Sequence, residues 1–369
     1  MLIGTATSAY QVEGNNKWAD WWYFERKGDL PYRSGKSCDQ YHFYEKDIKI
    51  MKSLGFNAYR FSIEFSRIYP SKGKLNREAI EHYRKLVDLL RKNEIEPIVT
   101  LWHYTLPKWF YDLGGFERAE NTAYFESYVE KIINAGIDAK YFLTMNEPVN
   151  YATQGYLMGE YPPFKRSPLA FRRVLVNLID VNDRTYSMLK KHGYTVSFTN
   201  AMYGFKYPKI AYPFYKVTDY TLNWWFLKRA KFDFVGINYY RAINPVSFRQ
   251  HGKGEMNWTI YPQGLYYLIS KAYSLFKKPV MITENGFASS DDRERSKFIT
   301  SHFKYIEEAM RKGIPVIGYL YWSFIDNFEW TYGYTKHFGL VSFDKKTMER
   351  HVRRSAFTLK RIADKYRGI

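Results

Sequence analysis

Two glutamates in this sequence each stand at the end of an apolar segment, directly before residues that interrupt a strand. Glu147 lies in the segment 144–148 (Thr-Met-Asn-Glu-Pro), and Glu284 lies in the segment 282–286 (Ile-Thr-Glu-Asn-Gly). Pro148 predicts extended backbone for Glu147 at the last position of a strand. The Asn-Gly pair predicts a turn directly after Glu284, which would then be the last residue of its strand. One such carboxylate is normally a solvated surface group, but two favour a pair that faces one site.

Paired carboxylates are suited to cleavage of glycosidic bonds. One carboxyl must hold a proton for the leaving oxygen, while the other stays ionised to attack or to activate water. Aromatic residues make up 20% of the chain, and the C–H faces of sugar rings pack on such rings. A third apolar segment is followed by Trp322, Glu329 and Trp330, which adds two indoles and a carboxylate beside a strand end. Trp322 alone could equally be a core residue.

Eight short apolar segments alternate with amphipathic helical patterns along the chain. Most of the segments are continuous apolar runs, which is typical of strands buried on both faces. Apolar spacings of three and four predict helices over 80–90 and 299–310, and glycines follow three helical patterns where a C-cap belongs. Eight such units favour an α/β fold, a (β/α)8 TIM barrel, although alternation alone also fits an open doubly wound sheet. The predicted strands are 2–5, 58–63, 98–102, 141–145, 196–199, 232–237, 280–283 and 316–321, and the three glycines are Gly55, Gly136 and Gly313.

The chain of 369 residues is long enough for a large core, and one barrel fills such a length. No linker, low-complexity tract or fixed-period repeat interrupts it, so we predict a single domain over residues 1–369. Catalytic residues of such barrels lie at the carboxyl ends of the strands. Glu147 and Glu284 are therefore expected at the same end of the molecule.

With these motifs, the sequence resembles the family 1 glycoside hydrolases, the β-glucosidase and β-glycosidase family. The resemblance runs nearly end to end and includes many long matches in the correct order. Two segments differ from the common family pattern and are most similar to archaeal members: 64–67 (Glu-Phe-Ser-Arg) and 103–107 (His-Tyr-Thr-Leu-Pro). The matching segments are 4–14, 57–63, 146–148, 236–240, 283–286, 322–330, 338–341 and 355–356.

The resemblance implies a TIM barrel and a retaining mechanism, with Glu147 as acid/base and Glu284 as nucleophile. It also implies that Arg60 and Tyr240 hold the nucleophile, and that the two carboxyl groups lie roughly 5–5.5 Å apart. Arg60 supplies a charge that keeps Glu284 ionised, while Glu147, facing another carboxylate, holds its proton longer. The positions implied to bind the terminal sugar are Gln11, His103, Asn146, Trp322, Glu329 and Trp330, with Trp322 as the stacking platform.

The expected reaction is exo-acting hydrolysis of terminal non-reducing β-D-glycosyl residues, with glucose as the favoured glycone. Members that act on 6-phosphosugars have phosphate-binding side chains in place of the Glu329 region, and a carboxylate there would repel a phosphate. We therefore expect unphosphorylated substrates. The segments 204–223 and 241–258 are shorter than is usual in the family, which affects the aglycone side of the cleft.

The net charge of +19 supports a different, non-enzymatic interpretation. Nine basic residues between Lys345 and Arg367 stand against two acidic ones, which suggests weak association with an anionic membrane surface. A solvated helix face explains the same charges, and nucleic acid is not expected as a partner. A sugar-binding relative without catalysis is disfavoured because both carboxylates are present.

Other classes of site have little support in the sequence. Cys38 is the single cysteine, and the eight histidines form no close pair, so we expect no metal and no cofactor. No signal peptide and no transmembrane segment is visible, so we expect a cytoplasmic protein. The sequence carries no signal for an oligomeric state.

Overall fold

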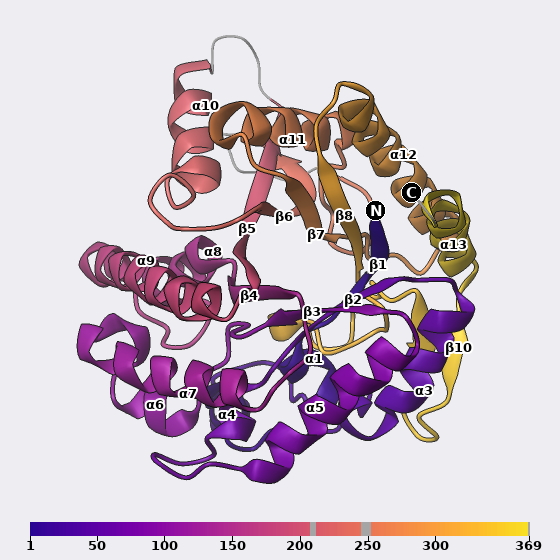
Figure 1. The fold of residues 1–369 in the computed structure, drawn as a ribbon. Coiled ribbons are helices and arrows are strands. Elements are labelled where there is room, and N and C mark those ends of the chain that lie inside the picture. The colour runs from indigo at the N-terminus through magenta and orange to yellow at the C-terminus, as the bar shows by residue number, and fades with distance from the viewer. Residues whose placement is uncertain (207–211, 245–251, 368–369) are drawn as a thin grey trace.

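The computed structural model describes residues 1–206, 212–244 and 252–367. Eight parallel strands form a closed barrel in chain order, and β8 closes it by pairing with β1 (Figure 1). This confirms the predicted (β/α)8 fold of the α/β class, whereas a single domain over 1–369 stays a prediction. The barrel strands are β1 (Leu2–Ala6), β2 (Ala58–Ser62), β3 (Glu96–Thr100), β4 (Tyr141–Asn146), β5 (Thr195–Phe205), β6 (Val235–Ile243), β7 (Val280–Asn285) and β8 (Val316–Trp322), and β9 (Val341–Phe343) and β10 (Arg350–Val352) form a separate antiparallel pair.

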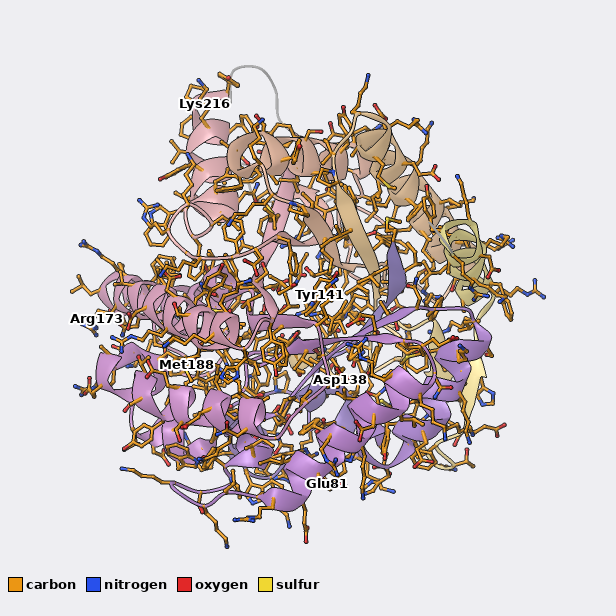
Figure 2. The ribbon with its side chains drawn as sticks, viewed as in Figure 1. Glu81, Asp138, Tyr141, Arg173, Met188 and Lys216 are labelled. Carbon is orange, nitrogen blue, oxygen red and sulfur yellow. The ribbon has the colours of Figure 1, made fainter. Side chains whose placement is uncertain are left out.

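Helices cover the outside of the barrel (Figure 1). Charged side chains on α5, α9 and α10, among them Glu81, Arg173 and Lys216, point away from the strands (Figure 2). Among the described residues, no helix combines the length and the apolar composition that crossing a membrane would require. The α-helices are α1 (Ala9–Glu13), α2 (Asp20–Lys27), α3 (Gln40–Ser53), α4 (Phe65–Ile68), α5 (Arg77–Lys92), α6 (Lys108–Asp112), α7 (Thr122–Asn134), α8 (Pro148–Ala152), α9 (Pro168–Lys191), α10 (Tyr212–Asp219), α11 (Pro262–Phe276), α12 (Asp292–Arg311) and α13 (Arg354–Tyr366).

Short irregular helices connect some of these elements. They are the 3-10 helices η1 (Gly115–Glu117), η2 (Ala119–Asn121) and η6 (Trp330–Tyr332), and the π-helices η3 (Thr153–Met158) and η5 (Tyr220–Trp224). Both predicted helices are present, as α5 and α12. The three predicted C-cap glycines all have positive φ, as a left-handed helix end requires.

The predicted limits of β3, β5 and β6 differ most from the observed ones, with β6 beginning at Val235 rather than at residue 232, whereas the other strands differ by one or two residues at their ends. β3 begins at Glu96 and ends at Thr100, because Glu96 pairs with Ala58 although it is polar. β5 and β6 both extend beyond the predicted ends and continue to pair past a bulge between Met202 and Gly204. Apolar runs do not mark these ends because each extension begins with an asparagine, Asn200 in β5 and Asn238 in β6. The predicted short loops 204–223 and 241–258 fall partly outside the described residues, at 207–211 and 245–251.

Inside the barrel, a layer of apolar side chains lies next to Arg60. Side chains alternate along a strand, so Ala58 faces the same way as Arg60, two residues later in β2. Ala58 packs with Ile98, Leu143 and Met281 in a buried apolar cluster. Arg60 is itself completely buried. A charged group is therefore held directly above an apolar layer, which makes its polar partners essential.

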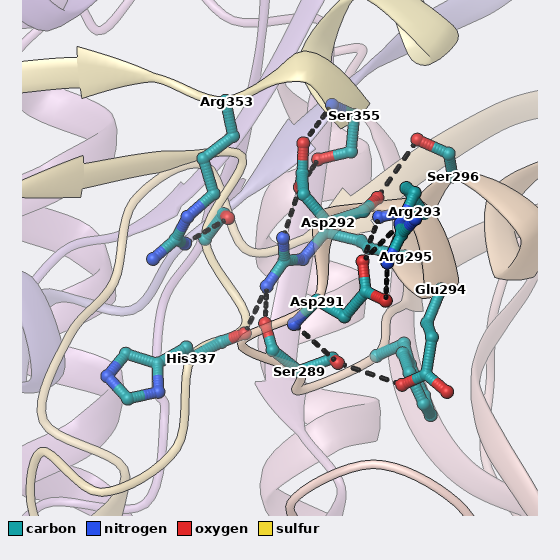
Figure 3. Close-up of polar contacts among 12 residues, drawn as sticks. Ser289, Asp291, Asp292, Arg293, Glu294, Arg295, Ser296, His337, Arg353 and Ser355 are labelled. Carbon is teal, nitrogen blue, oxygen red and sulfur yellow. Dashed lines mark hydrogen bonds and ion pairs between the residues drawn. The ribbon is translucent and has the colours of Figure 1, made fainter.

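A buried arginine ties the segment after β7 to the end of the chain (Figure 3). The guanidinium of Arg295, on α12, donates to Asp292, to the carbonyl of Ser289 and, at 2.7 Å, to the carbonyl of His337. Asp292 in turn accepts a hydrogen bond of 2.6 Å from the backbone N–H of Ser355, at the start of α13. This network fixes the path of the chain just beyond the strand that carries Glu284.

Several of the basic residues near the C-terminus form ion pairs within the fold. Arg350 contacts Asp47 at 2.9 Å with both groups buried. The remaining pairs are Arg353–Asp326, Lys360–Asp364, Lys365–Glu307 and Arg367–Asp364. These contacts account for part of the basic segment structurally.

Candidate active site

A cavity of about 200 Å³ opens at the carboxyl ends of the barrel strands. The structure brings all ten residues that the sequence predicted into this region. Nine of them line the cavity, and Arg60 lies beneath it in contact with Glu284. The nine lining residues are Gln11, His103, Asn146, Glu147, Tyr240, Glu284, Trp322, Glu329 and Trp330.

Glu284 is held from two sides by hydrogen-bond donors. It lies one residue before the end of β7, so the prediction that it is the last strand residue is wrong by one position. Arg60 donates to its Oε1 at 2.6 Å, and the hydroxyl of Tyr240 donates to its Oε2 at 2.6 Å. Arg60 also donates to the carbonyl of Thr283 at 3.2 Å. These contacts fix the carboxylate in one orientation and place a positive charge against it.

Glu147 adopts a backbone conformation that the sequence did not predict. It follows the last residue of β4 with φ 47° and ψ 57°, so the expectation of extended backbone is wrong. Its N–H still donates to the carbonyl of Thr199 at 2.9 Å, as a strand residue would, while Pro148 begins α8. The left-handed turn changes the chain direction from strand to helix within one residue. A non-glycine residue in this conformation costs roughly 1–2 kcal/mol, and such strain concentrates at functional sites.

The carboxylate of Glu147 accepts hydrogen bonds from three neutral side chains. Asn238 donates to Oε1 at 2.7 Å, and the hydroxyl of Tyr104 and the amide of Asn150 both donate to Oε2, the latter at 3.2 Å. Asn150 also donates to the hydroxyl of Tyr104 at 2.7 Å. Glu147 therefore differs from Glu284 in having neutral donors where Glu284 has a guanidinium.

Burial raises the pKa of both carboxyl groups. The pKa of Glu284 rises to about 7, against the lowering effect of Arg60 and with a further increase from Glu147. Burial also raises the pKa of Glu147, although the hydrogen bonds from Tyr104 and Asn238 favour its ionised form. Because the two groups interact, they titrate as a pair. Two interacting buried carboxyl groups with one guanidinium, that of Arg60 on Glu284, favour a state that holds a single proton.

Asn146 connects the two carboxylates and orients a histidine. Its Oδ1 accepts from Arg60 at 2.7 Å and from Asn238 at 3.1 Å, so its amide nitrogen is the donor to Nε2 of His103, at 3.1 Å. Burial and the nearby Arg60 hold the pKa of His103 well below its usual value. The neutral ring then carries its proton on Nδ1, which is buried and has no partner among the described residues. This N–H is available to a bound hydroxyl group.

A third carboxylate lies at another wall of the cavity. Gln11, on α1, donates to Glu329 at 3.3 Å and to the carbonyl of Phe328 at 3.0 Å. The indole of Trp322 also donates to Glu329 and favours its ionised form. Burial has the larger effect and raises the pKa of Glu329 to about 8. Trp322 and Trp330 lie nearly parallel to His103, at ring-centroid distances of 5.9 and 6.2 Å. The cavity thus combines hydrogen-bonding groups with flat aromatic walls.

Sequence reasoning missed three residues that contact Glu147. Asn238 lies two positions before Tyr240 in β6, and the period of two in a strand could have placed both on the face toward the cavity. Tyr104 lies in the variant segment 103–107, and no local pattern indicates that its hydroxyl contacts a residue 43 positions away. Asn150 is one turn after Glu147, a spacing at which side chains meet on a helix.

A closed parallel barrel with paired carboxylates at the carboxyl ends of its strands is the arrangement of a glycoside hydrolase. The family model described as "Glycosyl hydrolase family 1" matches residues 1–216 and 243–367. This chain therefore belongs to glycosyl hydrolase family 1 and is an O-glycosyl hydrolase that acts on β-glycosides. The sequence-based family resemblance is confirmed.

Proteins of this family from several organisms are similar to the chain over nearly its whole length. Beta-glucosidase A from Thermotoga maritima is 31% identical, with 96% of this chain and 95% of the relative covered. Beta-glucosidase A from Acetivibrio thermocellus is 29% identical over 432 residues, covering 98% of this chain and 96% of the relative. The solved structure of a beta-glycosidase from Pyrococcus horikoshii is 40% identical, with a TM-score of 0.93, and the match covers 98% of this chain and 93% of that one.

Proposed function

We propose that this chain is a retaining, exo-acting β-glucosidase that removes terminal non-reducing, unphosphorylated β-D-glucosyl residues. In this proposal Glu284 is the nucleophile and Glu147 is the acid/base. The observation that carries it is the unequal environment of the two carboxylates. Glu284 contacts a guanidinium at 2.6 Å, whereas Glu147 has the neutral donors Tyr104, Asn150 and Asn238. We place the single proton of the pair on Glu147, because a charged guanidinium favours the ionised form of Glu284 more strongly than neutral donors favour that of Glu147.

In the first step, a carboxylate oxygen of Glu284 attacks the anomeric carbon as the bond to the aglycone oxygen breaks. Glu147 gives its proton to that oxygen, so the aglycone leaves as a neutral alcohol or phenol. Arg60 and Tyr240 hold the attacking carboxylate in place. Attack opposite the aglycone inverts the anomeric carbon and forms an α-linked glycosyl ester.

In the second step, water hydrolyses the ester. The negative charge of Glu284 has gone, so Glu147 ionises more readily and its three donors stabilise the carboxylate. Glu147 removes a proton from water, the water oxygen attacks the anomeric carbon, and the bond to Glu284 breaks. The second inversion restores the β configuration. Retention requires roughly 5–5.5 Å between the two carboxyl groups, which stays a prediction.

The remaining lining residues are proposed to bind the terminal sugar. Glu329 accepts hydrogen bonds from two hydroxyl groups, and Gln11 and Nδ1 of His103 complete the polar contacts. Trp322 provides an aromatic face for the ring. A 6-phosphate would meet the negative charge of Glu284 in a buried cavity, which supports an unphosphorylated glycone. Glucose is proposed because the two curated relatives described above are named Beta-glucosidase A.

Replacement of the proposed nucleophile tests this function. Glu284→Ala is expected to reduce turnover of 4-nitrophenyl β-glucoside by at least about 10⁴-fold, since the covalent route is lost. Sodium azide should restore part of the rate and give the α-glucosyl azide, because azide occupies the space of the missing carboxylate. Substantial turnover by this variant without azide, or formation of the β-azide, would show that Glu284 is not the nucleophile.

Replacement of the proposed acid/base gives a different pattern. Glu147→Ala is expected to slow hydrolysis of an alkyl β-glucoside far more than that of 2,4-dinitrophenyl β-glucoside, whose leaving group needs no proton. With the activated substrate, azide should now give the β-azide, because it attacks the glycosyl ester on Glu284. Equal losses on both substrates would contradict the role of Glu147.

A further inference from the structure

Arg241 is a cation in the wall of the catalytic cavity that the proposed mechanism does not use. It follows Tyr240 directly in β6, and it lines the same cavity as Glu147 and Glu284. Within the part of the chain that the structure describes, Arg241 forms no ion pair with a carboxylate. The two internal segments outside that part, 207–211 and 245–251, contain no Asp or Glu.

Two aromatic rings hold the guanidinium of Arg241. Its central carbon lies 5.6 Å from the ring centroid of Tyr203 and 5.2 Å from that of Trp258. The backbone around Trp258 is paired on both sides: the N–H of Lys253 donates to the carbonyl of Trp258 at 3.0 Å, and that of Ala242 to the carbonyl of Thr259 at 2.8 Å. Aromatic faces stabilise a cation without neutralising it. The positive charge of Arg241 is therefore positioned by the fold and remains available to an anion.

The place of Arg241 indicates which part of a substrate it would meet. Arg241 contacts the ring of Tyr203 on β5, and β5 pairs with β4, the strand that Glu147 directly follows. Arg241 therefore lies on the side of the acid/base. Glu147 protonates the oxygen that leaves with the aglycone, and the aglycone must extend past this side. The sugar end of the cavity contains Glu284, which is ionised in the proposed mechanism and repels a negative charge. An anionic group is thus compatible with the aglycone end alone.

We propose that Arg241, clamped between Tyr203 and Trp258, forms an aglycone subsite for an acidic group, a carboxylate or a phosphate, carried by the leaving group of the β-glucoside. This inference rests on the proposed function and adds the chemical class of its aglycone. The net charge of +19 acts in the same direction, because it attracts anionic substrates at long range.

The test compares two aglycones that differ in one charge. The substrates are 4-carboxyphenyl β-glucoside and its neutral methyl ester, and the readout is the ratio of their kcat/KM values. The ratio for each variant is divided by that of the wild type, which cancels the intrinsic reactivity of the two phenols and any general loss of activity. Arg241→Gln is expected to lower the ratio about tenfold or more, the size of one charge-assisted contact, and Arg241→Lys less.

Lys253→Gln is the matched control, because Lys253 is exposed, lies in the same neighbouring segment as Trp258 and carries the same charge. It should leave the ratio within twofold of the wild type. A third substrate, the 4-(phosphonomethyl)phenyl glucoside, separates the two acidic groups: a larger effect of Arg241→Gln on it than on the carboxylate identifies phosphate as the preferred group. An unchanged ratio in Arg241→Gln overturns the proposal, whereas failure of the wild type on both aglycones overturns the proposed function itself.

Discussion

Arg60 donates a hydrogen bond of 2.6 Å to the carboxylate of Glu284 and another of 2.7 Å to Asn146, the residue that precedes Glu147. One buried guanidinium therefore holds one carboxylate directly and the backbone neighbour of the other. Because Arg60 is on β2, Asn146 on β4 and Glu284 on β7, the contact joins three strands across the barrel. Loss of the Arg60 guanidinium should therefore change both the relative position of the Glu147 and Glu284 carboxyl groups and their charge.

Replacement of Arg60 is expected to change the pH dependence of catalysis. Arg60 lowers the pKa of Glu284, so its removal raises that pKa and moves the acidic limb of kcat/KM to higher pH. Arg60→Gln should also lower kcat/KM by about 10²–10³-fold at neutral pH. Arg60→Lys retains a charge and should shift the limb less. Measurement of kcat/KM from pH 4 to 9 checks this, and an unchanged limb in Arg60→Gln would show that Arg60 does not set the charge of the nucleophile.

Tyr104 is expected to position and tune Glu147. Its hydroxyl donates to the carboxylate and favours the ionised form, so Tyr104→Phe raises the pKa of Glu147 and moves the basic limb of kcat/KM to higher pH. The rate should fall about threefold to tenfold, the size of one lost hydrogen bond. Tyr332→Phe, an exposed residue lining the same cavity, is the control. Equal profiles for wild type and Tyr104→Phe would indicate a purely structural role.

Glu329 should make the stability of the fold depend on pH. Its pKa in the fold is about 8, above the ordinary value of 4.5, so the folded state binds more protons than the unfolded state between these values. Stability then falls as the pH rises through this range and levels off above it. Glu329→Gln carries no titrating group and should lose less stability between pH 5 and 8. Urea denaturation at both pH values measures the difference, and an equal loss in the two proteins would contradict the raised pKa.

Arg295 and Arg293, two positions apart on α12, should differ sharply in their contribution to stability. Arg295 is fully buried and its removal leaves Asp292 without its charged partner, which typically costs about 3–5 kcal/mol. Arg293 has a side chain that is 88% exposed, and its removal should cost less than about 0.5 kcal/mol. The free energies of unfolding of Arg295→Met and Arg293→Met provide the comparison. Similar values would mean that the network in Figure 3 does not stabilise the fold.

The fold was predictable because the buried strands of a parallel barrel are continuous apolar runs. Most of the strand starts agree with those runs. The ends of β5 and β6 could not be found this way, since Tyr240 and Arg241 continue β6 with polar groups that face the cavity or its rim. A strand in a barrel ends where its partner stops pairing, and that is a property of two segments rather than one.

The catalytic pair was predictable for a related reason. Glu147 and Glu284 stand directly at strand ends, where Pro148 and the Asn-Gly turn interrupt the apolar pattern. Contacts between distant segments, such as that of Tyr104 with Glu147, depend on side-chain directions that spacing does not encode. The left-handed backbone of Glu147 was missed because the effect of a following proline predicts extended geometry, whereas the start of α8 requires an immediate turn.

Isolation of the covalent intermediate tests the central claim most directly. The protein is incubated with 2,4-dinitrophenyl 2-deoxy-2-fluoro-β-glucoside, which forms the glycosyl ester readily and hydrolyses it slowly. Mass spectrometry of a proteolytic digest should then place one fluoroglucosyl group on the peptide that contains Glu284, with the attachment at that side chain. Attachment to another residue, or no covalent adduct while 4-nitrophenyl β-glucoside is still hydrolysed, would contradict the account.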